Sequence, residues 1–324
     1  MTVKRGRKTV TVSQWGIKVP KSKGESFRRY LLANGDWCPN LKPIPDGDYL
    51  VFPTVSESIT LPDELADCDC DIKKYEFESR AAVREPARHE LIGGIAIMQD
   101  DDVSEAEYLL KSRPSIHTVL HCESPVFGEY RIKKFRVLAG KETTRTSYIE
   151  YNNRFTIDLA VAYFSARLAN ERQRVLRLMK DGERVLDMFT GVGPFPIALS
   201  KKASVIYAGD INPGAVELLC ENLRINRTDN VIPMLADALD LSGVLPPHSF
   251  DRIIMNLPMT STAFLETAFS LAKKGGIIHY YTLQSEKGEM LPLLRGFTAG
   301  KIDERVVRSY SPTQHHAVYD IVCE

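Results

Sequence analysis

The sequence predicts an α/β protein in which two smaller α+β domains precede a parallel-rich, doubly wound sheet. Three observations support this prediction. The length of 324 residues is enough for two or three domains. From about residue 160 onward, apolar strand-like runs alternate with helical patterns of about ten residues, which is typical of βαβ units. The earlier segments mix short strands and helices without that alternation. We therefore expect domains at residues 1–62, 70–158 and 159–324.

The C-terminal domain is expected to open with a helix and then to alternate strand and helix. The predicted helices cover residues 167–179, 193–203, 213–225 and 264–272. The predicted strands cover residues 185–188, 205–209, 230–234, 251–256 and 277–282, with a closing strand pair at 304–310 and 316–323. Parallel strands connected in this way present all their carboxyl ends at one edge of the sheet, where ligands bind.

The two smaller domains are predicted from turn residues and short periodic runs. In the first we expect a strand at 15–20, a helix at 24–33 that ends at Asn34-Gly35, and a strand that ends at 53. The acidic stretch 61–71 is expected to be a linker. In the second we expect a helix at 104–111 capped by Ser104, and strands at 90–98, 117–121, 130–138, 143–150 and 155–159.

Composition excludes several classes of protein. With 44% hydrophobic and 26% charged residues, the chain falls in the ordinary globular class. The sequence contains no run of about 18 apolar residues, so no membrane span is predicted. No apolar segment follows the basic N-terminus, so no secretory signal is predicted. The six cysteines lack the paired spacing of a zinc site, so we expect reduced thiols in the cytoplasm. His121, His279, His315 and His316 are expected to be surface residues, and no metal is expected.

Charge gives a local rather than a global indication of nucleic-acid binding. The chain has 42 basic and 42 acidic residues, so its net charge is zero. Residues 1–30 nevertheless carry nine basic side chains against a single acid, Glu25, and residues 127–145 carry six basic side chains. Such patches suit a phosphate backbone, although a solvated face explains each of them equally well.

A glycine-containing turn follows the first strand of the predicted wound sheet. Gly191 and Gly193 allow the backbone to approach a ligand at the end of that strand. Asp210 ends the next strand and is placed to bind ribose hydroxyls, while Asp237 follows the third strand, where an acid that contacts adenine is expected. Pro196 stands where a dinucleotide fingerprint requires its third glycine, which argues against a dinucleotide. Asp187 on the first strand suits a cationic or amino-bearing ligand instead, so we expect S-adenosylmethionine. A purely structural role for the glycines stays open.

A second motif, Asn-Leu-Pro at 256–258, ends the fourth strand on the same side of the sheet. An asparagine there can offer a donor and an acceptor to the edge of a planar base. With this motif the chain resembles the archaeal and eukaryotic type of tRNA (guanine-37-N1)-methyltransferase. The segments that carry the resemblance are DMFTGVGPF at 187–195, DINP at 210–213, NLP at 256–258, YFSARLANER at 163–172, GGIIHY at 275–280 and GIKVP at 16–20. The chain departs from the family pattern at Thr190, at Ala166 and at residues 259–262.

The resemblance implies a class I (Rossmann-like) methyltransferase fold, S-adenosylmethionine as cofactor and N1 of guanine 37 in tRNA as methyl acceptor. Glu171 matches the family's general base, and Arg131 or its neighbour Arg136 matches the arginine that stabilises charge on guanine O6. Tyr163 would pack beside the cofactor and the base. Cofactor contacts are implied for Asp187, Phe189, Gly191, Gly193, Asp210, Ile211, Asp237, Ala238 and Asn256, the last of which also binds the base.

Other interpretations of the sequence stay open. Glu171 could be a solvent-facing helix carboxylate beside Arg172 and Arg174. A related enzyme of wyosine synthesis could act on the same nucleotide, by transferring an aminocarboxypropyl group or by methylating a tricyclic guanine derivative. A protein that binds tRNA without catalysis is the alternative from a different class. The resemblance further implies that the N-terminal domain grips the outer corner of the tRNA, and we expect a monomer.

Overall fold

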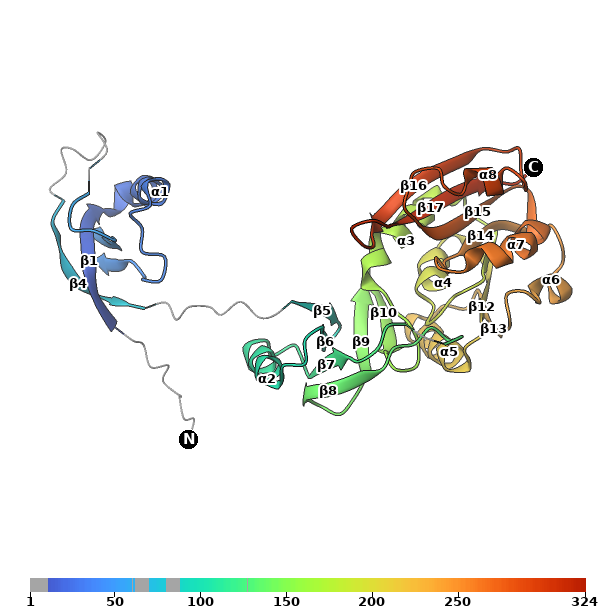
Figure 1. Cartoon of the computed structure of the whole chain (residues 1–324), viewed down its shortest axis with the longest axis horizontal. Helices are drawn as coiled ribbons and strands as arrows, with labels where there is room; N and C mark the ends of the chain where they lie inside the picture. The colour runs from blue at the N-terminus through green and yellow to red at the C-terminus, as the bar shows by residue number, and fades with distance from the viewer. Residues whose placement is uncertain (1–10, 60, 62–69, 80–87, 127) are drawn as a thin grey trace. The chain divides into compact units, whose positions relative to one another are not determined.

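The computed structural model describes residues 11–59, 61, 70–79, 88–126 and 128–324. Most of the predicted linker 61–71 and the basic residues Lys4, Arg5, Arg7 and Lys8 lie outside these ranges. The chain divides into two compact units, residues 1–85 and 86–324 (Figure 1). Among the described residues, no helix combines the length and the apolar character that crossing a membrane requires.

The N-terminal unit is an antiparallel sheet with one helix. Its sheet has the order β2 (Ile44–Asp46), β3 (Tyr49–Pro53), β1 (Thr11–Pro20) and β4 (Ile72–Glu78), and its helices are η1 (Lys21–Lys23) and α1 (Gly24–Asn34). The helix ends at Gly35, whose left-handed φ of 74° provides the predicted cap. Its buried face, Phe27 and Leu31, packs with Ile17 of β1.

The predicted end of the first domain needs correction. Strand β4 was expected to open the second domain, but it pairs along β1 from Thr11–Glu78 to Ile17–Ile72. Because β4 completes the N-terminal sheet, the boundary lies at Glu85/Pro86 and not at residues 62–70. The sequence could not show this, since a strand's partner is set by register and not by proximity in sequence.

The second unit contains all the remaining elements. Its first part consists of β5 (His89–Ile92), β6 (Ile95–Met98), α2 (Val103–Ser112), β7 (Thr118–Cys122), β8 (Phe135–Gly140), β9 (Arg145–Glu150) and β10 (Asn153–Asp158). It continues with η3 (Ala166–Leu168), α3 (Ala169–Leu178), β11 (Glu183–Asp187), α4 (Pro194–Leu199), β12 (Ala203–Asp210), α5 (Pro213–Asn226) and β13 (Val231–Leu235). It ends with α6 (Leu241–Val244), β14 (Phe250–Met255), η4 (Ser261–Phe264), α7 (Leu265–Leu271), β15 (Ala272–Gln284), α8 (Leu291–Leu294), β16 (Ile302–Ser309) and β17 (His315–Val322).

A seven-stranded sheet dominates this unit, in the order β13-β12-β11-β14-β15-β17-β16. The first five strands are parallel, and β17 runs antiparallel to both of its neighbours. The chain proceeds outward from β11 to β13, then returns to place β14 on the other side of β11. This reversal is a topological switch point, where the loops after β11 and β14 separate and leave a crevice.

Alternating side chains of the central strands cover the two faces of the sheet. On β11, Val185 packs in one core cluster with α3, α4 and α5, while the next residue, Leu186, packs in the other with α6, α7 and α8. Strand β14 divides in the same way, with Ile254 in the first cluster and Ile253 in the second. The period of two follows from strand geometry and gives the predicted layered α/β fold.

The predicted middle and C-terminal domains share one hydrophobic core. Ile95 of β6, Leu120 of β7 and Phe155 of β10 belong to the same buried cluster as Val185 of β11. Residues 86–158 therefore belong to the same compact unit as the wound sheet, although the sequence predicted a separate domain there. Apolar periodicity identifies a buried face but does not identify what buries it.

Three local predictions differ from the structure. The single strand expected at 90–98 is a hairpin, because Gly93 turns at a φ of 56°. Helix α2 is capped by Asp102, whose Oδ1 accepts from the backbone N–H of Glu105 at 3.0 Å, and not by Ser104. The strand expected at 130–138 begins only at Phe135, and Arg131 lies in a turn at a φ of 54°.

Candidate functional site

A cavity of about 540 Å³ opens at the carboxyl ends of β11, β12 and β14. This volume is within the usual range for small-ligand sites. Its wall includes nine of the predicted site residues: Arg131, Tyr163, Phe189, Gly191, Asp210, Ile211, Asp237, Ala238 and Asn256. Asp187, Gly193 and Glu171 are absent from the wall. The structure thus brings most of the predicted residues together and places three of them behind the surface.

Asp210 holds the glycine loop in place. One carboxylate oxygen accepts from the N–H of Gly191 at 2.7 Å and the other from the N–H of Asn212 at 2.9 Å. Gly191 has a φ of 54°, and a Cβ at this position would meet only the carbonyl oxygen of Tyr163, at 3.7 Å. The bare backbone at Gly191 therefore faces open space in the cavity, as close approach to a ligand requires.

Gly193 is required for packing. Its φ is 91°, and a Cβ there would lie 2.4 Å from Cδ1 of Leu219 on α5. The cofactor contact that the resemblance implied for Gly193 stays a prediction. The glycine brings α5 close to the start of α4, next to the loop that faces the cavity.

Asp187 lies beneath the loop. Its side chain is buried, and Oδ1 accepts from the N–H of Phe189 at 3.2 Å. Burial, together with the nearby charge of Asp210, raises the pKa of Asp187 to about 7. Asp187 therefore supports the turn from below through Oδ1, while its buried Oδ2 has no hydrogen-bond partner among the described residues.

The raised pKa makes a prediction about stability. Between its ordinary pKa of 3.8 and about 7, Asp187 binds a proton more strongly in the folded state than in the unfolded state. Its contribution to stability therefore falls as pH rises through this window and is constant above it. In Asp187→Asn this loss is absent, so its melting temperature relative to wild type should rise by a few degrees from pH 5 to pH 8.

Thermal unfolding at several pH values checks this expectation. Asp229→Asn, at an exposed position after α5, is the matched control and should parallel the wild type. A constant offset between Asp187→Asn and wild type across the pH range would contradict the account of Asp187.

Asn256 presents an unsatisfied polar atom at the cavity. Its Oδ1 is buried and accepts no hydrogen bond from any described residue. The backbone beside it is fixed, because the N–H of Leu283 donates to the carbonyl of Pro258 at 3.0 Å. A buried acceptor without a partner is costly, so its presence here indicates a ligand that donates a hydrogen bond to Asn256.

Of the two arginines between which the sequence left the choice open, only Arg131 lines the cavity. Arg136 donates to Glu123 at 3.1 Å and also pairs with Asp101, and it is absent from the cavity wall. Arg131 lines the cavity and forms no ion pair with any carboxylate in the described ranges. The backbone of Arg131 is in the left-handed region, which is unfavourable for a residue other than glycine, so the surrounding structure must stabilise this conformation. Arg131 therefore stays the prediction for the arginine at guanine O6, and like Arg308 it lines the cavity without an ion pair to a described carboxylate.

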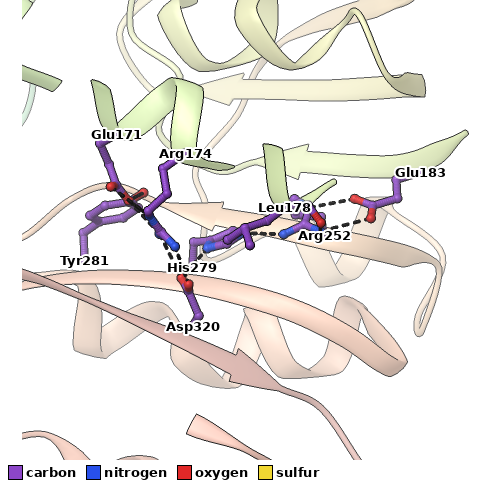
Figure 2. Close-up of polar contacts among 8 residues, drawn as sticks. All are labelled: Glu171, Arg174, Leu178, Glu183, Arg252, His279, Tyr281 and Asp320. Atoms are coloured by element: carbon purple, nitrogen blue, oxygen red, sulfur yellow. Dashed lines mark hydrogen bonds and ion pairs between the residues drawn. The ribbon is translucent and has the colours of Figure 1, made fainter. Parts of the chain in front are cut away.

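Glu171 is buried one layer behind the cavity, on α3. Figure 2 shows its carboxylate between Arg174 and Tyr281. Arg174 donates to it through Nε at 2.9 Å and Nη2 at 2.7 Å, and the hydroxyl of Tyr281 donates at 2.7 Å. The interpretation of Glu171 as a solvent-facing carboxylate is therefore wrong, since only 6% of the residue is exposed.

A chain of buried polar groups extends from Glu171 across the sheet (Figure 2). Arg174 also binds Asp320, which accepts from Nδ1 of His279 at 2.5 Å. Arg252 donates to Nε2 of His279 at 2.6 Å and to Glu183 at 2.6 Å. Since an arginine can only donate, Nε2 of His279 accepts and Nδ1 carries the proton.

The electrostatics of this chain agree with that tautomer. Burial lowers the pKa of His279 and favours its neutral form. Burial opposes ionisation of Asp320, but the hydrogen bonds from His279 and Arg174 hold the pKa of that carboxyl well below its usual range. Arg174 is therefore shared by two carboxylates, so Glu171 and Asp320 are held in fixed positions.

Two histidines that were expected on the surface are buried. His279 is 0% exposed and belongs to the polar chain, while His316 is 2% exposed and lies in the cavity wall. Their strands, β15 and β17, pair in the sheet, and the doublet His315-His316 gave no sign of which residue faces inward. The nearly continuous apolar run 317–323 indicated a buried strand but could not show which of the two histidines faces inward.

The comparisons with known proteins agree with this geometry. A model of the TRM5/TYW2 methyltransferase domain matches residues 146–304, and a model of the tRNA methyltransferase 5 N-terminal domain matches residues 16–58. The tRNA (guanine(37)-N(1))-methyltransferase Trm5b of Pyrococcus abyssi is 33% identical, over 94% of this chain and 97% of the relative.

Two further relatives mark the range of similarity. A solved complex of aTrm5 with tRNALeu has a TM-score of 0.77 at 28% identity, over 95% of this chain and 99% of that one. The tRNA 4-demethylwyosine(37)-methyltransferase Taw21 of Saccharolobus solfataricus is 32% identical, but over 72% of this chain and 93% of the relative.

Proposed function

Because the chain belongs to the TRM5/TYW2 methyltransferase family, we propose that it transfers a methyl group from S-adenosylmethionine to N1 of guanine 37 in tRNA. The observation that supports this most is a single cavity in which the glycine loop, Asp210 and the unsatisfied Asn256 meet. One side of the cavity suits a nucleoside cofactor and the other suits a planar base.

The cofactor side fits S-adenosylmethionine in its donor groups. When bound, this cofactor supplies an electrophilic methyl group on a sulfonium centre. Asp210 ends β12 and lines the cavity, so its carboxylate can accept from ribose hydroxyls at the edge of the loop that it holds. Asp237 and Ala238, after β13, would bound the adenine, and the backbone of Gly191 leaves room for the remainder. Alignment of the methyl with its acceptor would supply much of the rate.

The substrate side has three groups suited to guanine. Asn256 would accept a hydrogen bond from the base edge, and Arg131 would stabilise charge that develops on O6. Tyr163 lines the cavity with 48% of its surface exposed, which leaves its ring available for contact with the base. The guanine must leave the anticodon-loop stack to reach these groups.

Loss of the N1 proton requires a base, and Glu171 stays the predicted one. Arg174 and Tyr281 both donate hydrogen bonds to its carboxylate and hold it in position. Its position behind the cavity wall means that a proton must be passed to it, or that its charge must act through a neighbour.

The tRNA itself would be held by both units. The match of residues 16–58 to the tRNA methyltransferase 5 N-terminal domain supports the proposal that this unit binds the outer corner of the tRNA. The described basic residues of this unit include Lys21, Arg28 and Arg29, which are all exposed. We further propose that the protein is a monomer and that it acts in the cytoplasm. The five described cysteines are free thiols, which agrees with a reducing compartment.

An enzyme of wyosine synthesis is the second candidate, because Taw21 is about as similar in sequence where it matches. Coverage separates the two candidates. The Trm5b relative matches 94% of this chain, whereas Taw21 matches 72%, and a separate model matches the N-terminal unit to tRNA methyltransferase 5. Methylation of guanine is therefore the better supported proposal.

Product analysis on tRNA transcripts that differ only at position 37 tests the proposal. With guanine at this position we expect a gain of one methyl, located on N1, and with adenine we expect none. A larger mass gain would indicate aminocarboxypropyl transfer. Modification only of tRNA that already carries a tricyclic base would establish the wyosine alternative.

A further inference from the structure

The two carboxylate oxygens of Glu171 receive different numbers of hydrogen bonds. Oε1 accepts from Nη2 of Arg174 at 2.7 Å, from Nε of Arg174 at 3.1 Å and from the hydroxyl of Tyr281 at 2.7 Å. Among the described residues, Oε2 accepts from Nε of Arg174 alone, at 2.9 Å. An ionised carboxylate has about four acceptor positions, two on each oxygen. Oε1 is therefore fully occupied, whereas Oε2 keeps the capacity to take a proton.

Tyr281 causes this difference between the two oxygens. Arg174 reaches both of them, and its guanidinium is fixed from its other side by Asp320, through Nη1 at 2.5 Å and Nη2 at 3.1 Å. The arginine therefore holds the carboxylate without selecting one oxygen. The hydroxyl of Tyr281 contacts Oε1 only, and it approaches from strand β15, opposite the helix that carries Glu171 (Figure 2).

The hydroxyl of Tyr281 is a permanent donor. The side chain is buried, and burial together with the negative charge of Glu171 raises the pKa of Tyr281 well above its usual value of 10. Tyr281 therefore keeps its proton at any pH at which the enzyme works, and it donates this proton in a hydrogen bond to the ionised carboxylate. It cannot itself serve as the proton acceptor.

The ring of Tyr281 is tied to the wall of the cavity. Its centroid lies 6.0 Å from that of Phe195 on α4 and 5.7 Å from that of His316 on β17, and both of these residues line the cavity. Buried rings are close-packed and have little freedom to move. The position of the Tyr281 hydroxyl, and with it that of Oε1, is therefore fixed relative to the cavity in which the base would bind.

We infer that Tyr281 is a positioning residue for methyl transfer, whose hydroxyl occupies Oε1 of Glu171 so that Oε2 receives the N1 proton. The inference rests on the proposed function and deepens it. The proton that leaves N1 ends on Oε2, and the electron pair of the broken N–H bond stays on the base, where N1 bonds the methyl group. The electron pair of the broken C–S bond stays on sulfur. Tyr281 supplies orientation to this step and exchanges no proton.

The test measures single-turnover methyl transfer to a tRNA transcript with guanine at position 37, at saturating tRNA and S-adenosylmethionine. Tyr281→Phe removes the hydroxyl and keeps the packed ring. We expect its rate to fall on the order of 10-fold, the usual effect of losing one hydrogen bond to a charged group. Because Tyr281 is absent from the cavity wall, the affinities for tRNA and cofactor should stay within a few-fold of wild type.

Tyr319→Phe is the matched control. Tyr319 lies on β17, is equally buried, and its hydroxyl donates to Gln284 at 2.6 Å, where neither residue lines the cavity. Both substitutions delete a buried tyrosine hydroxyl with a hydrogen-bond partner, so both should lower the melting temperature. Only Tyr281→Phe should slow methyl transfer. An equal loss of rate in Tyr319→Phe would overturn the inference.

A double-mutant cycle with Glu171→Gln separates positioning from a structural role. If Tyr281 acts through Glu171, Tyr281→Phe should slow the Glu171→Gln enzyme by less than about twofold. An equal loss in both backgrounds would overturn the inference, and so would a Tyr281→Phe rate equal to or above that of wild type. If the wild-type enzyme adds no methyl to N1, the proposed function fails and the inference fails with it. An active wild type with a normal Tyr281→Phe overturns the inference alone.

Discussion

Glu171→Gln should slow single-turnover methyl transfer on the order of 1000-fold while it leaves cofactor binding nearly unchanged. The substitution removes the carboxylate that is proposed to accept the N1 proton. It also leaves Arg174 with one carboxylate, Asp320, in place of two. The proposed cofactor site is the glycine loop and Asp210, which Glu171 does not contact, so cofactor affinity should stay within a few-fold.

Glu183→Gln is the matched control for this prediction. Glu183 ends the same polar chain and pairs with a buried arginine, Arg252, at 2.6 Å, but it lies at the far end from the cavity (Figure 2). If Glu171→Gln acted only by leaving a buried arginine without its partner, both variants would lose activity and stability alike. We expect Glu183→Gln to lower the melting temperature and to retain most of the single-turnover rate. A near-normal rate in Glu171→Gln would remove it from the mechanism.

The wound sheet was predictable because its signals are local. Val185 and Leu186 both face helices, so the strand is continuously apolar, and Asn34-Gly35 ends α1 where its chemistry requires. The partners of elements were not predictable. Whether β4 belongs to the first or the second unit depends on pairing with β1 across about 60 residues of intervening chain, and local pattern carries no information about it.

In the candidate site, too, some features follow from local sequence and others depend on how strands pair. Gly191, Asp210 and Asn256 end their strands at one edge of a parallel sheet, so topology alone brings them into one cavity. His316 reaches that cavity from β17, a strand whose position beside β15 follows from antiparallel pairing late in the chain. Its inward direction depends on register, and a shift of one residue would place His315 there instead. For the same reason the burial of Glu171 was open, since either face of α3 could have met the sheet.

Arg131→Ala should lower the rate of methyl transfer on the order of 500-fold, the usual effect of removing one donor that stabilises a developing oxyanion. As N1 is methylated, electron density shifts to guanine O6, and Arg131 lines the cavity and forms no ion pair with the described carboxylates. Since this charge develops mainly in the transition state, the effect should appear in the single-turnover rate at saturating tRNA more than in tRNA affinity.

Arg136→Ala is the matched control for Arg131→Ala. Arg136 lies five residues away in the same basic segment, is 45% exposed at its side chain, and is bound to Glu123 and Asp101. A general loss of positive charge near the RNA would weaken tRNA binding to a similar extent in both variants and would be relieved at low salt. A specific role at O6 requires that only Arg131→Ala lose its rate and that low salt fail to restore it. Equal losses in the two variants would show that Arg131 holds the RNA backbone and does not stabilise charge on the base.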